Sequence, residues 1–186
     1  MKKSFSFLLF CLLTTTLLAQ KIKYTDSFLE KLEQTQIDVF TPVEGKYKSV
    51  RPLKNDFQPI DHAIVSKREK IVIRYSVIPY DSDKPATQLP HVDFMRLVTS
   101  VASNDEDAGV VSVHALDNPQ LKTYFNADWG SMAYFKPKYR FSEAQHCRLL
   151  ALFKEGQGTV YVFFLFDEPS PALDNRLRAL QFRTNL

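Results

Sequence analysis

The chain has 186 residues, of which 45% are apolar, 24 are lysine or arginine and 21 are aspartate or glutamate. Two of the basic residues, Lys2 and Lys3, stand at the very start, so the remainder balances 22 basic against 21 acidic residues. A nearly neutral chain has no electrostatic reason to bind nucleic acid or an acidic membrane surface, so neither partner class is expected.

The first segment has the pattern of a secretory signal peptide over residues 1–19. The two lysines precede an apolar run, Phe5 to Leu18, that is too short to span a bilayer, and cleavage is expected after Ala19. No later segment is apolar for long enough to cross a membrane. We therefore expect an exported, periplasmic or secreted protein that folds as a single domain over residues 20–186.

The domain is predicted to begin with a helix and to continue with short strands. Asp26 or Ser27 is expected to cap the helix, with Glu30 completing a capping box after Ser27. From residue 37 to residue 61 the chain can form only short strands, because turn-forming residues interrupt it: Pro42, Gly45, Pro52 and Pro59.

A strand and a helix with clear periodicity follow. Alternation over residues 70–79 predicts a strand with Arg74 and Ser76 on a partly wet face and four side chains toward the core: Ile71, Ile73, Tyr75 and Val77. Residues 90–103 are predicted to form a helix that packs across a sheet, because one apolar stripe runs along it: Phe94, Leu97, Val98 and Val101.

The second half is predicted to hold two short elements, a hairpin and a closing helix. A strand is expected at 110–116, and Asn118 is expected to cap a short helix. Residues 147–153 and 159–166 flank the turn "KEGQG" and predict a β-hairpin, whose second strand is apolar on both faces and therefore central. Residues 170–182 are predicted to form a helix capped by Ser170.

This order of elements resembles the photosystem II extrinsic subunit P family. The resemblance rests on "VRPLKNDFQPIDHAIV", "KIVIRYSVIP" and "GQGTVYVFFLFDEPSPALDNRLRALQF". It implies an α+β fold, an antiparallel β-sheet flanked by helices on both faces (a PsbP-like sandwich), and a role in binding or assembly. It carries over no catalytic residue. The leader ending "LLAQ" resembles those of exported Bacteroidetes proteins.

No residue pattern predicts a cofactor or a metal. The four histidines are scattered, and no phosphate loop, serine nucleophile elbow or zinc-binding helix motif occurs. His146 and Cys147 are neighbours on a predicted strand and would point to opposite faces, so a base for Cys147 would have to come from His62 or His114. The favoured interpretation of Cys147 is a small buried core residue.

Aromatic residues concentrate between residues 124 and 141, around "FNADWG". Asn126 and Gly130 are expected to end a helix and form a turn, with Asp128 bonding backbone N–H groups and Trp129 mostly buried. The favoured interpretation is thus a structural corner. Clustered aromatics also suit stacking on a sugar or a partner, so the alternative is an interaction surface made by four residues: Asp128, Trp129, Tyr134 and Tyr139.

The sequence therefore favours an exported, non-enzymatic binding or assembly module. Its partner would be an envelope protein or a small ligand, and no oligomeric state is predicted. The alternative is a hydrolase that uses carboxylates or a Cys/His pair distant in sequence.

Overall fold

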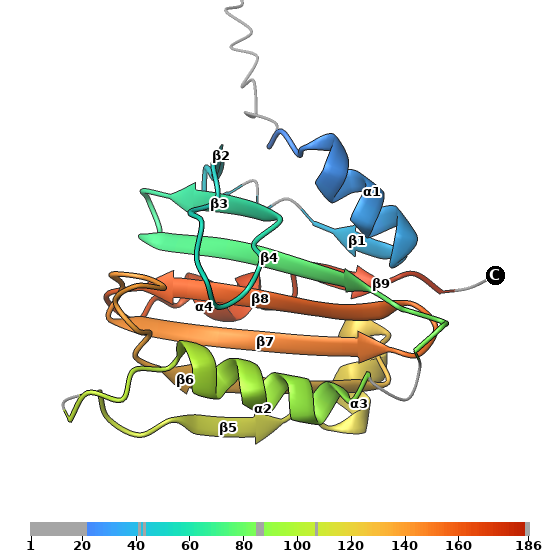
Figure 1. Ribbon diagram of the computed structural model, residues 1–186. Helices are drawn as coiled ribbons and strands as arrows, with labels where there is room; N and C mark the ends of the chain where they lie inside the picture. Colours follow the sequence, from blue (N-terminus) through green and yellow to red (C-terminus); the bar gives the residue numbers. More distant parts are fainter. Residues whose placement is uncertain (1–21, 41, 43, 85–87, 107, 185–186) are drawn as a thin grey trace, which may run out of the picture.

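The computed structural model describes residues 22–40, 42, 44–84, 88–106 and 108–184, and it is a mixed α/β fold with one large antiparallel sheet and a few helices (Figure 1). The predicted signal peptide over residues 1–19 lies outside these residues. None of the helices described is long and apolar enough to cross a bilayer.

Seven strands form the large sheet, and every neighbouring pair is antiparallel. Their order across the sheet is β2 (Lys48–Val50), β3 (His62–Ser66), β4 (Ile71–Pro79), β8 (Gly158–Phe166), β7 (His146–Lys154), β6 (Trp129–Phe135) and β5 (Ser112–Ala115). The β7–β8 hairpin was predicted and is confirmed. Residues 160–166 of β8 are all buried, as expected for a central strand that is covered on two sides.

One face of the sheet packs against the N-terminal helix, α1 (Asp26–Gln34), through Phe28 and Leu32. The alternate residues of β4 that were predicted to point into the core all lie in this cluster. The predicted caps of α1 are wrong. Thr25 is the N-cap, because its Oγ1 accepts a hydrogen bond from the N–H of Phe28.

Helix α2 (Pro90–Val101) lies across the opposite face, in front of β6 and β7 in Figure 1. Its predicted stripe is confirmed, since all four of its apolar residues are buried there. The prediction that the second face of β4 is partly exposed to solvent is wrong. Arg74 and Ser76 are both buried, because elements distant in sequence cover them.

The C-terminal segment differs from its prediction. Helix α4 covers only Ala172–Arg176, and Leu180–Phe182 forms a strand, β9. This strand pairs with β1 (Ile37–Val39), placing Leu180 opposite Val39. The leucine spacing that suggested a longer helix instead places Leu173 and Leu180 in the same core cluster.

A compact turn of helix leads from β5 to β6. It consists of α3 (Asn118–Gln120) and a π-helical turn, η2 (Leu121–Phe125). The cap is Asp117 rather than the predicted Asn118, because Asp117 and Gln120 form a reciprocal capping box. Leu121 and Phe125 pack into the same cluster as α1.

A buried histidine beneath α1 makes the stability of the fold sensitive to pH. His62 stacks on Phe28, with ring centroids 4.9 Å apart, and its Nε2 has no hydrogen-bond partner among the residues that the structure describes. Burial lowers the pKa of His62 below its usual 6.5. The unfolded chain therefore binds the proton more readily, and stability falls as the pH drops below about 6.5 toward the pKa of the folded state.

We expect the free energy of unfolding to decrease between about pH 7 and pH 5, and His62→Phe to flatten this dependence, because the imidazolium is removed. Urea denaturation across this range checks the prediction. His91 is exposed on α2, so His91→Gln serves as the control that should keep the wild-type slope. An unchanged slope in His62→Phe would contradict the prediction.

Candidate functional site

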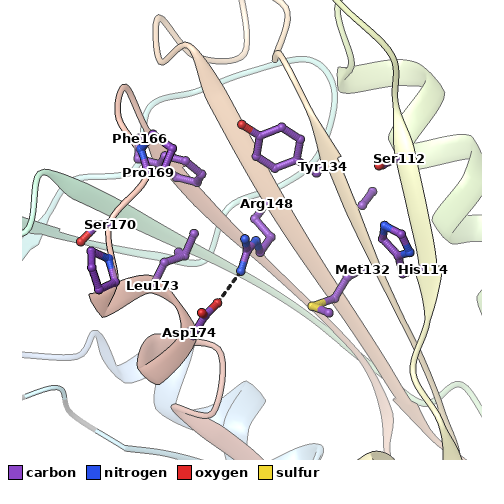
Figure 2. A pocket seen from close by; sticks show the side chains of 12 residues that line it. Ser112, His114, Met132, Tyr134, Arg148, Phe166, Pro169, Ser170, Leu173 and Asp174 are labelled. Carbon is purple, nitrogen blue, oxygen red and sulfur yellow. Dashed lines mark hydrogen bonds and ion pairs between the residues drawn. The ribbon is translucent and has the colours of Figure 1, made fainter.

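A groove of about 770 Å³ lies between α4 and the end of the sheet formed by β5 and β6. We call it the α4–β5 groove. Figure 2 shows its sheet side and, facing it, the segment from Pro169 to Asp174. Its lining residues are Ser112, His114, Met132, Ala133, Tyr134, Arg148, Phe166, Pro169, Ser170, Pro171, Leu173 and Asp174.

The antiparallel register brings these side chains together. Tyr134 of β6 lies between Ser112 of β5 and Arg148 of β7, and Met132 lies opposite His114. Residues directly opposite one another across an antiparallel sheet point to the same face. The floor of the groove is therefore built from alternate residues of three adjacent strands, on the face that also carries α4.

One wall of the groove is aromatic. The hydroxyl of Tyr134 is hydrogen-bonded to Nδ1 of His146, 2.8 Å away, and the two rings stack with centroids 5.5 Å apart. Phe166 packs beside both rings. The hydrogen bond and the stacking fix the ring of Tyr134, so the apolar surface beside it is preformed.

The groove also contains an ion pair, drawn as a dashed line in Figure 2. Arg148 donates to Oδ1 of Asp174 at 2.7 Å. The side chain of Arg148 is 29% exposed and that of Asp174 is 79% exposed. An ion pair with such an exposed partner contributes less than about 1 kcal/mol. A ligand carboxylate or sulfonate can therefore replace Asp174 at little energetic cost.

The structure does not bring the four predicted surface residues together. Tyr134 lines the α4–β5 groove. Trp129 is half-buried on the opposite face of the sheet, where it packs edge-on against Phe94 with centroids 5.8 Å apart. Tyr139 is exposed in the loop between β6 and β7, where its hydroxyl bonds to Glu143.

The fourth predicted residue, Asp128, is exposed at the structural corner. Its carboxylate accepts the backbone N–H of Glu155 at 3.0 Å and pairs with Lys122 at 2.8 Å. The predicted backbone bond is thus present, and its donor belongs to the neighbouring hairpin turn. Asn126 ends the helical turn in the left-handed conformation, with φ 49°, as predicted.

Gly130 does not form the predicted turn. It is the second residue of β6, where a Cβ atom would lie 2.8 Å from Leu121 and 2.9 Å from Leu152. A side chain here would displace these leucines, because the core packs directly against the backbone of Gly130. Periodicity alone could not distinguish this role from a turn.

Cys147 is fully buried, as predicted, and burial raises the pKa of its thiol well above the usual range. It belongs to the cluster on the α2 face. His114 and His146 lie on the other face, and so does His62 beneath α1. The structure therefore brings neither of the predicted histidine bases to the thiol.

Sequence reasoning identified only Tyr134 among the residues of the α4–β5 groove. Arg148 and Phe166 lie on predicted strands, but the face that they share with Met132 follows from the register between neighbouring strands, which the periodicity of one strand does not give. The available signal was the polar residue Arg148 within the otherwise apolar strand from Cys147 to Phe153.

Comparison of the chain with protein-family models, with curated proteins and with solved structures finds no match in any of the three. Within the part of the chain that the structure describes, no group of three or more histidine, cysteine, aspartate or glutamate side chains lies close enough to hold a metal ion.

Proposed function

We propose that this chain is an exported, non-enzymatic binding module that takes a small amphipathic ligand into the α4–β5 groove. The apolar body of the ligand would lie on Met132, Tyr134 and Phe166, and its anionic end would meet Arg148. We further propose that the sheet, with α1 and α2 packed against opposite faces, is a PsbP-like sandwich, which the order of elements supports.

The lining of the groove is the observation that carries this proposal. Pockets for small ligands typically enclose roughly 300–1,000 Å³ and combine apolar walls with a few polar groups that orient the ligand. The α4–β5 groove encloses about 770 Å³, and Figure 2 shows Arg148, paired with Asp174, between the apolar side chains of Leu173 and Met132.

The edges of the sheet favour a small ligand over a partner that adds a strand. The outer strands are β5, with four residues, and β2, with three. Short edge strands offer few unpaired backbone groups, which is how proteins limit pairing with another chain. The concave groove is therefore the better-supported recognition site.

No observation favours the hydrolase alternative. The thiol of Cys147 is buried and separated by the sheet from His114 and His146. The neighbouring acidic residues Asp167 and Glu168 are exposed after β8 and do not line the α4–β5 groove.

Anilinonaphthalene sulfonate is a suitable probe, because it joins an apolar body to a single anionic group. We expect its fluorescence to rise on saturable binding to the native protein. Met132→Glu should weaken binding at least tenfold, because it places a charge on the apolar floor. The matched control is Met95→Glu, which changes an exposed methionine of α2 on the opposite face and should leave the affinity within twofold.

Circular dichroism identifies any variant that has lost its native structure, since a partly unfolded chain also binds this dye. Equal affinities for the folded Met132→Glu and Met95→Glu variants would place the binding elsewhere and overturn the proposal.

A further inference from the structure

A buried arginine lies on the face of the sheet opposite the α4–β5 groove. Arg74 is on β4, between Ala63 of β3 and Phe163 of β8, and is only 7% exposed. Its Nη1 donates a hydrogen bond to the backbone oxygen of Phe141 at 2.7 Å, and its guanidinium lies 5.2 Å from the centroid of that ring. A guanidinium has five N–H donors. Most of this capacity is therefore not used within the described chain.

No carboxylate among the described residues compensates the charge of Arg74. Burial lowers the pKa of Arg74, and its ionisable neighbour is the thiol of Cys147. That thiol is neutral, because burial raises its pKa. A buried cation without a counter-charge destabilises a fold, whereas a bound anion would supply the missing partner.

Arg74 opens onto a separate cavity of about 630 Å³, the Arg74 cavity. Apolar side chains from β4, β8 and the β6–β7 loop line part of it: Val72, Phe141 and Leu165. Charged side chains also line it: Lys54, Lys70, Arg140, Glu143 and Asp167. Lys70 and Arg140 each have an acidic partner, Glu168 at 3.5 Å and Asp56 at 2.8 Å. Arg74, which has no acidic partner among the described residues, is the most buried of the cations that line the cavity.

We propose that the Arg74 cavity binds the carboxylate of a small organic acid. The planar guanidinium can donate two parallel hydrogen bonds to a carboxylate, whose single charge matches that of Arg74. The body of the ligand would contact the apolar lining. Glu143 and Asp167 disfavour a phosphate group, which carries more negative charge. This site is independent of the proposed function, because the α4–β5 groove is on the other face.

Benzoate and inorganic phosphate, titrated separately at constant ionic strength into ¹⁵N-labelled protein, test the proposal. Benzoate should shift the Nε–H resonance of Arg74 and the amide resonances of residues 141–144 in a saturable manner. Arg74→Met should bind benzoate at least tenfold more weakly. Arg74→Lys should bind it with intermediate affinity, because lysine keeps the positive charge but cannot donate two parallel hydrogen bonds from a planar group. Lys54→Met, a change at the rim, should stay within threefold, and Met132→Glu in the α4–β5 groove should bind benzoate like the wild type.

Arg74→Met also reports on folding. Without ligand, its melting temperature should rise by roughly 2–8 °C, because an apolar side chain replaces an uncompensated buried cation. Benzoate should then raise the melting temperature of the wild type and leave that of Arg74→Met unchanged. The proposal would be overturned by an unperturbed Arg74 resonance, by equal benzoate affinity in Arg74→Met, or by phosphate binding as tightly as benzoate.

Discussion

Arg176→Met should lower the free energy of unfolding by about 3 kcal/mol, because it leaves a buried carboxylate without its main partner. Arg176 of α4 donates two hydrogen bonds to Glu69, at 2.7 and 3.0 Å, and the two side chains are only 10% and 11% exposed. The hydroxyl of Tyr47 also donates to Glu69, at 2.8 Å. Because this hydrogen bond from Tyr47 remains in Arg176→Met, the expected loss of stability lies at the lower end of the roughly 3–5 kcal/mol that is typical for breaking a buried ion pair.

Two variants make the Arg176 prediction specific. Glu69→Gln combined with Arg176→Met should recover part of the lost stability in urea denaturation, because no buried charge then remains. Arg140→Met removes an ion pair whose side chains are 77% and 82% exposed and should cost less than about 1 kcal/mol. A loss in Arg176→Met no larger than that in Arg140→Met would show that the buried pair does not stabilise the fold.

Gly158→Ala should also destabilise the fold by about 3 kcal/mol, because both the backbone angle and the available space oppose a side chain. Gly158 has φ +135°, and a Cβ atom would lie 2.3 Å from the backbone oxygen of Ile78. A backbone atom of a central strand cannot rotate away as a side chain can. The clash would disturb the pairing of β4 with β8, where Gly158 lies opposite Pro79.

Gly156 is the matched control for this change. It also has a positive φ, +73°, but nothing lies within 4 Å of its added Cβ atom. Gly156→Ala should therefore cost only the backbone strain, about 1 kcal/mol. Thermal and urea denaturation of both variants separate the cost of backbone strain from the cost of the steric clash. Equal losses of stability would show that the backbone near Ile78 moves to remove the clash.

The strands and helix with the clearest periodicity were predictable from the sequence. Tyr75 and Val77 alternate with Arg74 and Ser76 in β4, and the stripe containing Phe94 appears once per helical turn in α2. Both patterns are local. The strand formed by residues 180–182 was not predictable, because its partner Ile37–Val39 lies near the other end of the chain.

The two cavities were harder to predict from the sequence than the strands and helices that line them. Tyr134 was identified through its aromatic neighbours, whereas Met132 and Arg148 enter the α4–β5 groove through strand register. Arg74 was predicted to be partly exposed to solvent. This prediction failed because the alternation along one strand does not show which elements cover its second face. The loop containing Phe141 provides that cover from a distant part of the sequence.

The pairing of β4 with β8 also has a consequence for how quickly the chain folds. It joins Ile71 to Phe166 and Pro79 to Gly158, so the middle of the sheet is closed by contacts between segments far apart in sequence. Such a topology folds slowly, because a long loop must be ordered before the pairing stabilises it. A chain synthesised from its N-terminus leaves the apolar strand Ile71–Pro79 without its central partner until residues 158–166 have emerged. During that interval the open edge of this strand can pair with strands of other chains, which is a route to aggregation.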